Sequence, residues 1–212
     1  MDDVEIARQL ERARGGDRSA VGALFEGHRV RLERLVTLRL DRRLRGRVDE
    51  TDVVQDTFLE AARRIQDYLE LPPMPFFLWL RFLAHQRLQA LCREHLGVLK
   101  RDPRREVPID DGPYPEASSE ALAVQLLGKL TTPSQAAVRA EMKARLTQAL
   151  ESIDPGDRQI IALRHFEELG HAEVAHLLGI DESAASKRYL RAIKRLKVVL
   201  DRIPGMSELP WK

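Results

Sequence analysis

Hydrophobic residues recur along most of this chain three or four positions apart, the spacing of an α-helix, and almost never alternate as β-strands require. A clear stripe begins after Asp49, which is placed to cap a helix, and its apolar positions are Val54, Phe58, Ala61, Ile65 and Leu69. Glycines and prolines punctuate this pattern. The predicted helices cover residues 4–14, 17–44, 49–68, 76–96, 121–130, 133–152 and, after Pro155, a segment through Phe166. The sequence therefore predicts an all-α fold.

One segment breaks the helical pattern. Residues 102–120 contain four prolines, Gly112 and two serines, a composition typical of an extended linker. We predict two small helical domains joined by a Pro-rich linker. The N-terminal domain spans 1–101, the linker 102–132, the C-terminal domain 133–202 and a short tail 203–212.

The last third of the chain has the pattern of a helix-turn-helix. A first helix over about 172–178 would bury Val174 and Leu178, Gly179 would form the turn, and Asp181 is placed to cap a second helix. The second helix would bury Ala185, Tyr189, Ile193, Leu196 and Leu200. Its other face carries Ser183, Lys187, Arg188, Arg191, Lys194 and Arg195. A short helix, a glycine turn and a basic helix favour insertion into a DNA major groove. The alternative is an ordinary helical hairpin with a solvated basic face.

Composition adds an uneven charge distribution. The net charge of the 212 residues is only +2, yet residues 29–47 hold eight arginines against Glu33 and Asp41. Residues 81–105 and 187–202 hold seven lysines and arginines each. Separate basic segments on a nearly neutral chain suggest several phosphate-facing surfaces, although the first, taken singly, fits solvated arginine-rich helices equally well.

The sequence offers little support for covalent chemistry or for a membrane location. Cys92 is the single cysteine, which fits a reducing compartment, and its neighbour His95 has no further ligands nearby to complete a metal site. No Gly-rich phosphate loop and no nucleophile–base pair is present. The most apolar run, 72–84, is short and broken by prolines, and the N-terminus does not resemble a signal peptide. We expect a cytoplasmic protein that is not an enzyme and needs no cofactor or metal, without membrane insertion.

Motifs from both halves of the chain, in this order, resemble the sigma-70 family of bacterial RNA polymerase sigma factors, in its extracytoplasmic-function (ECF) form. The N-terminal part has the run DETDVVQDTF from Asp49 and the aromatic run FFLWLRFLAHQ from Phe76. The C-terminal part has Asp154-Pro155, Arg158 and Leu163-Arg164, followed by the helix-turn-helix. The resemblance covers about 15–105 and 144–202.

The resemblance implies a division of labour between three surfaces. Core RNA polymerase would bind Asp52, Val53, Gln55, Asp56 and Phe58, a segment that could also be a capped, solvated acidic helix start. Single-stranded promoter DNA would bind Phe76, Trp79, Arg81, Gln86, Gln89 and Arg93, although the aromatics could equally be core. Duplex DNA would meet Glu182, Ser183, Ser186 and Lys187 at base edges and Arg188, Arg191 and Arg195 at phosphates.

Three departures from the family pattern bear on these assignments. Gln86 stands where the family often has Asn, Gly170 where it commonly has Ser or Thr, and Ala184-Ala185 where many relatives have Thr-Val.

The function that the resemblance implies is promoter-directed initiation by core RNA polymerase, with an anti-sigma protein as a further partner by analogy. The alternatives are a helix-turn-helix regulator that acts without stable polymerase association, a DNA recombinase that docks through the motif, and a sigma-like regulator that binds polymerase but not promoters. A recombinase needs a nucleophilic Ser or Tyr in a basic catalytic domain, and neither Tyr68 nor Tyr114 has that setting.

Overall fold

The computed structural model describes residues 1–96, 118–128 and 136–203. Within these ranges all regular structure is helical apart from one isolated bridge between Arg45 and Val48, so the predicted all-α class is confirmed. The chain divides into two compact units, Met1–Pro115 and Glu116–Lys212. None of the described helices combines the length and apolar character that a bilayer crossing requires.

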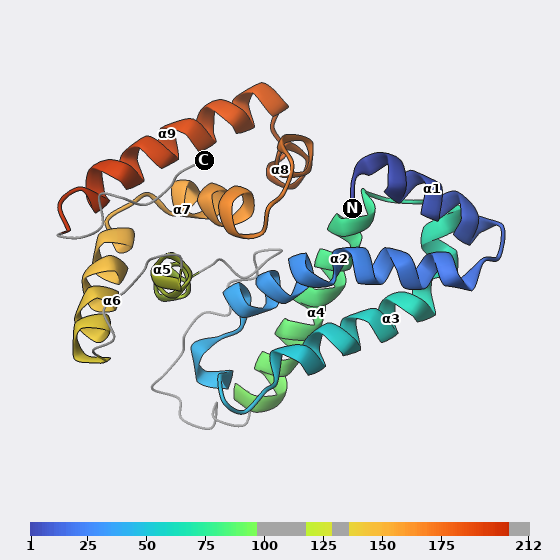
Figure 1. Ribbon diagram of the computed structural model, residues 1–212, viewed down its shortest axis with the longest axis horizontal. Helices are drawn as coiled ribbons and strands as arrows, with labels where there is room; N and C mark the ends of the chain where they lie inside the picture. The colour runs from blue at the N-terminus through green and yellow to red at the C-terminus, as the bar shows by residue number, and fades with distance from the viewer. Residues whose placement is uncertain (97–117, 129–135, 204–212) are drawn as a thin grey trace. The chain divides into compact units, whose positions relative to one another are not determined.

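The described part of the first unit contains α1 (Asp3–Arg14), α2 (Arg18–Arg39), the 3-10 turn η1 (Arg42–Leu44), α3 (Glu50–Glu70) and α4 (Phe76–Leu96) (Figure 1). The side chains of Asp2, Asp17 and Asp49 cap α1, α2 and α3 by accepting a hydrogen bond from a backbone N–H of the first turn. These caps explain why each helix begins within a residue or two of its predicted start.

Helix α2 ends earlier than the hydrophobic pattern predicts. The expected helix ran to residue 44, but Leu40 is extended and the chain turns into η1. The Asp41 carboxylate accepts a hydrogen bond from the Arg43 backbone N–H at 2.8 Å. Such a local side-chain bond offers the backbone an alternative to the next helical turn.

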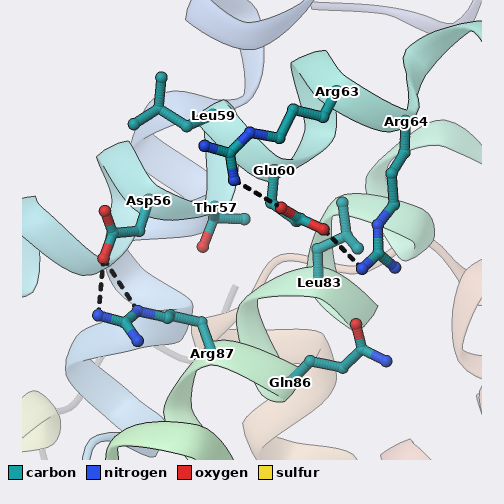
Figure 2. Close-up of a pocket in the computed structure, with 9 residues that line it drawn as sticks. All are labelled: Asp56, Thr57, Leu59, Glu60, Arg63, Arg64, Leu83, Gln86 and Arg87. Carbon is teal, nitrogen blue, oxygen red and sulfur yellow. Dashed lines mark hydrogen bonds and ion pairs between the residues drawn. The ribbon is translucent and has the colours of Figure 1, made fainter.

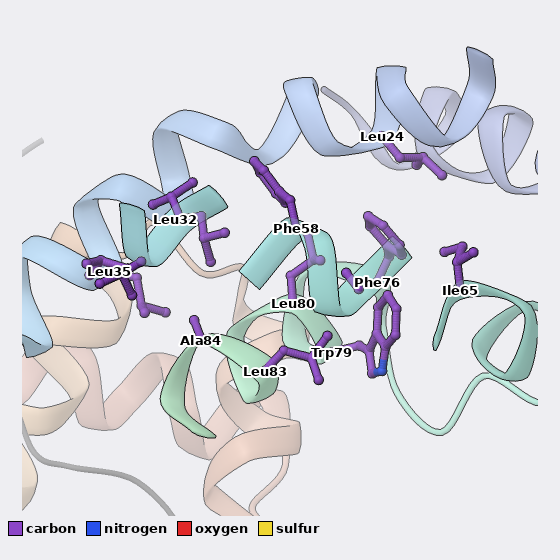
Figure 3. Packing of buried hydrophobic residues seen from close by; sticks show 14 of the residues in the cluster. Leu24, Leu32, Leu35, Phe58, Ile65, Phe76, Trp79, Leu80, Leu83 and Ala84 are labelled. Carbon is purple, nitrogen blue, oxygen red and sulfur yellow. The ribbon is translucent and has the colours of Figure 1, made fainter. Parts of the chain in front are cut away.

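The core of the first unit lies where α2, α3 and α4 meet (Figure 3). Its buried residues include Leu24, Leu32 and Leu35 from α2, Phe58 and Ile65 from α3, and Phe76, Trp79, Leu80 and Ala84 from α4. An aromatic cluster closes one end, with Tyr68 stacked on Trp79 at 4.6 Å and Phe25 on Phe58 at 5.0 Å between ring centroids. Aromatic stacking of this kind adds to the stability that burial provides.

The described part of the second unit contains α5 (Ser119–Gly128), α6 (Ala136–Glu151), α7 (Pro155–Ile161), the π-helical turn η3 (Ala162–Phe166), α8 (His171–Leu178) and α9 (Glu182–Leu200) (Figure 1). Helices α6, α7 and α8 each pack against α9. Most of the predicted linker, and the predicted capping residues 132–135 of α6, lie outside the described residues.

Candidate nucleic-acid interfaces

Helices α8 and α9 form the helix-turn-helix that the sequence predicts. Gly179 ends α8 in the left-handed region at φ +62°, and the Asp181 side chain caps α9 by accepting from the Ala184 N–H at 2.7 Å. The Gly170 N–H donates to the Glu173 side chain at 2.7 Å, so half of a capping box is present at the start of α8 although Gly170 has no side chain to cap with.

The packing of α9 leaves one long side of the helix open. Ala185, Ala192, Leu196 and Leu200 are buried, whereas Tyr189 and Ile193, predicted to be buried, are half-buried. The exposed side carries Glu182, Ser183, Lys187, Leu190, Arg191 and Lys194, with Ser186 half-buried beside them. This side therefore presents three cations and two large apolar side chains, Leu190 at 56% and Val198 at 55% exposed. Leu190 was absent from the predicted contacts because an isolated leucine beside arginine carries no distinct sequence signal.

Arg188 and Arg195 lie against α7. A β-carbon built on Gly156 would lie only 2.0 Å from Arg188 Nη2, so this guanidinium sits directly on the start of α7. Arg195 Nη1 forms an ion pair with Asp157, whose side chain is only 7% exposed. Arg188 and Arg195, two of the three arginines predicted to contact phosphate, therefore interact with α7 of the same protein. The third, Arg191, lies on the open side of α9.

A second group of contacts ties the turn before α8 to α9. Arg164 in η3 donates to the Leu169 carbonyl and lies 3.1 Å from His171 Nε2, while its guanidinium carbon lies 5.4 Å from the centroid of the Tyr189 ring. Burial raises the pKa of Tyr189 above its usual range. These contacts connect η3 to the start of α8 and to α9.

In the first unit, the predicted polymerase-binding residues divide by exposure. Asp52 and Gln55 are exposed on α3, and Asp56 is half-buried. Val53 is 1% exposed and Phe58 9% exposed, both in the core. This differs from the expectation that all five face a partner, because side chains inside the core have no surface to offer without unfolding the helix.

A groove between α3 and α4 lies beside this surface (Figure 2). Arg87 of α4 bridges to Asp56 of α3 through Nε and Nη2, at 2.9 and 2.8 Å from the carboxylate oxygen Oδ2. Glu60, one turn further along α3, pairs with Arg63 and Arg64 of the same helix. The pairing with these two arginines holds the pKa of Glu60 below its usual range even though partial desolvation raises it. Alternating charges thus line the groove, and Asp56 reaches any partner only together with Arg87.

The predicted single-strand contacts on α4 also divide by exposure. Gln86 and Arg93 are exposed and Gln89 is half-buried, spaced so that they share one side of the helix. Phe76, Trp79 and Arg81 are 3%, 7% and 1% exposed. The expectation that these three lie at the strand-binding surface is not met, because the aromatic rings fill the core beside Tyr68.

The segment before α4 is the exposed feature nearest to those aromatics. Leu71, Pro72, Pro73 and Pro75 are exposed, and the Tyr68 hydroxyl holds the segment by donating to the Met74 carbonyl at 3.0 Å. Burial raises the pKa of Tyr68 to about 12, so the hydroxyl remains a donor at neutral pH. Tyr68 was not predicted as part of a site, since a tyrosine at the end of an apolar stripe resembles any other core residue.

Comparison with known proteins finds a family model that matches part of the second unit and relatives that match most of the chain. The family model for sigma-70, region 4 matches residues 143–196, which contain α7, η3, α8 and most of α9. CnrH, an RNA polymerase sigma factor of Cupriavidus metallidurans, is 29% identical over 202 residues that cover 89% of this chain and 91% of CnrH. NccH of Alcaligenes xylosoxydans xylosoxydans, named an RNA polymerase sigma factor, is 28% identical and covers 94% of this chain and 97% of its own. BldN of Streptomyces coelicolor, an ECF RNA polymerase sigma factor, is 23% identical over 94% of this chain and 67% of its own.

A solved structure of CnrH in complex with the cytosolic domain of CnrY matches with 23% identity and a TM-score of 0.49, over 93% of this chain and 96% of the matched one.

The fold and the open side of α9 define a two-unit helix-turn-helix protein. The matched motifs and relatives point more closely: the chain is similar to sigma-70 family proteins, among them sigma factors of the ECF group.

Proposed function

We propose that this chain is a sigma factor that binds core RNA polymerase and directs initiation of transcription at specific promoters. The observation that carries the proposal is the open basic side of α9, on a helix-turn-helix that matches the region-4 family model. A regulator acting without polymerase is disfavoured because relatives named as sigma factors match nearly the whole chain, including the first unit.

The two units have separate tasks in this proposal. Residues 1–101 bind core polymerase and the opened minus-ten element, residues 133–202 bind the duplex minus-thirty-five element, and residues 102–132 connect them, with α5 of this stretch packed against α6 in the second unit. The tether makes the second binding event effectively intramolecular, so neither unit needs high affinity alone. Catalysis belongs to the polymerase, and the chain acts in the cytoplasm without a cofactor.

Residue roles follow from exposure. On α9, Ser183 and Lys187 contact base edges and Arg191 contacts phosphate. On α3, Asp52 and Gln55 dock on a basic polymerase surface. The remaining single-strand contacts on α4 are Gln86, Gln89 and Arg93.

Regulation by an anti-sigma protein is part of the proposal. CnrH, a relative over most of its length, has been solved in complex with the cytosolic domain of CnrY. The inhibitor of this chain would cover the same exposed surfaces that polymerase and promoter need. Co-purification followed by mass spectrometry would report core polymerase and the inhibitor together.

The test is initiation by purified core polymerase with variants of α9. Lys187→Gln combined with Arg191→Gln should reduce promoter-specific transcripts at least tenfold while leaving core binding unchanged, because both side chains lie on the open side of α9. Arg145→Gln is the matched control, an exposed arginine on α6 that pairs with Glu141. Loss of core binding in the double variant, or transcription equal to that of the control, would contradict the assignment.

A further inference from the structure

The arginine-rich segment 29–47 does not form one basic surface. The Arg31 guanidinium carbon lies 3.7 Å from the centroid of the Phe77 ring, Arg39 is 5% exposed, and Arg29 pairs with Glu26. Such arginines support the fold. Arg43 and Arg47, in and just after the turn η1, are exposed and serve no core packing.

This turn lies beside the C-terminal end of α4. In Figure 1 the segment between α2 and α3 reaches the last turns of α4. Burial raises the pKa of the Cys92 thiol; the Asp41 carboxylate raises it further, whereas Arg43 and Arg93 lower it, as charges of both signs close to the sulfur would. Arg93 occupies the end of the α4 side that also carries Gln86 and Gln89.

We propose that Arg43, Arg47 and Arg93 form a phosphate-binding surface that extends the strand-binding side of α4 and holds the DNA backbone beyond the nucleotides that α4 contacts. The proposal rests on the proposed function and adds to it a third DNA contact, supplied by a turn that the sequence pattern assigned to a helix. Guanidinium groups suit this role because their forked donors match phosphate oxygens.

The Asp41 carboxylate competes with phosphate for one arginine of this surface, Arg43. Its carboxylate accepts from Arg43 Nε at 3.1 Å and Nη2 at 2.8 Å, and the Arg43 side chain remains 57% exposed. Hydrogen bonds from Arg43 hold the pKa of Asp41 below its usual range, so the carboxylate is charged at neutral pH. A phosphate therefore competes with Asp41 for Arg43, and an exposed ion pair in water is exchanged easily.

Nucleic acid is a better partner for this surface than an acidic face of the polymerase, because the arginines continue the side of α4 that already carries the proposed strand contacts. The polymerase surface proposed to meet Asp52 and Gln55 of α3 is basic, and a basic face would repel these arginines. Two measurements separate these partners. Loss of a DNA contact changes the affinity of the holoenzyme for the promoter and the salt dependence of that affinity, whereas loss of a protein contact changes the affinity of the chain for core polymerase.

The experiment measures binding of the holoenzyme to a promoter fragment between 50 and 200 mM salt for the wild type, Arg43→Gln, Asp41→Asn and Arg8→Gln. Arg8 is the matched control, since its side chain is 62% exposed and pairs with Glu5 much as Arg43 pairs with Asp41. Each loss of a phosphate contact should lower the slope of log affinity against log salt by about 0.7 on single-stranded DNA and about 0.9 on duplex DNA. Across this fourfold salt range the wild type should therefore lose roughly threefold more affinity than Arg43→Gln.

Asp41→Asn should act in the opposite direction, with tighter promoter binding, because the amide keeps the bond to the Arg43 N–H but removes the competing charge. Arg8→Gln should match the wild type in both slope and affinity. The inference is overturned if Arg43→Gln shows the same slope of log promoter affinity against log salt as the wild type. It is also overturned if this variant binds core polymerase more weakly and the promoter as tightly as before. If the wild-type holoenzyme binds no promoter at all, the proposed function fails instead.

Discussion

Arg195 on α9 forms an ion pair with Asp157 on α7, and the carboxylate is buried whereas the arginine is largely exposed. The pair therefore joins α7 to α9 through two residues that lie 38 positions apart in the sequence. Together with Arg188 on Gly156, it sets how far α9 stands from α7. Helix α9 is therefore held in place by two of the arginines predicted from the sequence to contact DNA phosphates.

Because of this ion pair, substitutions of Arg195 and Arg191, both on α9, should have different effects on stability and on DNA binding. Arg195→Gln should lower the free energy of unfolding of the second unit by about 1–3 kcal/mol, because it leaves the buried Asp157 carboxylate without its charged partner. Arg191→Gln should leave stability within about 0.5 kcal/mol of the wild type and weaken duplex binding. Chemical denaturation and a duplex-binding assay on both variants make the comparison. Equal stability of the two would mean that the ion pair contributes nothing in solution.

Tyr68 predicts a pH dependence in the alkaline range. Burial raises its pKa from the ordinary 10.0 to about 12, so the folded state favours the protonated hydroxyl. The stabilisation is present in full below pH 10 and is lost as the pH rises from 10 through 12. Denaturation midpoints of wild type and Tyr68→Phe at pH 8 and pH 11 should therefore converge at the higher pH.

At pH 8 the Tyr68→Phe variant should be less stable by about 0.5–1.5 kcal/mol, through loss of the hydrogen bond to the Met74 carbonyl. A constant difference between the two proteins across the pH range would show that the hydroxyl is not held in the folded state. Tyr189 is present in both proteins, so its own titration cancels in the comparison.

Gly179 predicts a conformational requirement in the helix-turn-helix. Its φ of +62° penalises any side chain, and no neighbouring atom lies within 4 Å of a β-carbon there, so the cost is purely one of backbone conformation. Gly179→Ala should destabilise the second unit by about 1 kcal/mol. Gly179→Asn should cost less, because asparagine tolerates this region. Thermal melts of the two variants give the order, and an alanine variant at least as stable as the asparagine one would contradict it.

Much of the second unit could be predicted from the sequence because its signals are local. Gly179 and Asp181 each act within four residues of their own position, and both do what their residue types predict. The contacts of Arg188 and Arg195 join α9 to α7, and no periodicity within α9 distinguishes an arginine that faces a helix from one that faces DNA. Exposure of Arg191 and burial of Asp157 had to come from the packing.

In the first unit, too, the sequence could not distinguish residues that pack in the core from residues that face a partner. The stripe containing Phe58 correctly predicted a buried face, and the family resemblance assigned the same residue to a partner. The aromatic run after Phe76 was open to either interpretation, since stacking on a base and packing in a core use the same rings. The early end of α2 depended on one side chain, Asp41, competing with a helical turn.

In the proposed function, this chain gives core RNA polymerase its choice of start sites. Sequencing the 5′ ends of transcripts made in vitro from genomic DNA, with core polymerase alone and with the chain added, tests it most directly. Discrete new start sites, each preceded by a shared pair of sequence elements, should appear when the chain is added and disappear with Lys187→Gln combined with Arg191→Gln. An unchanged set of start sites, together with tight binding of the chain to palindromic duplexes in the absence of polymerase, would contradict it.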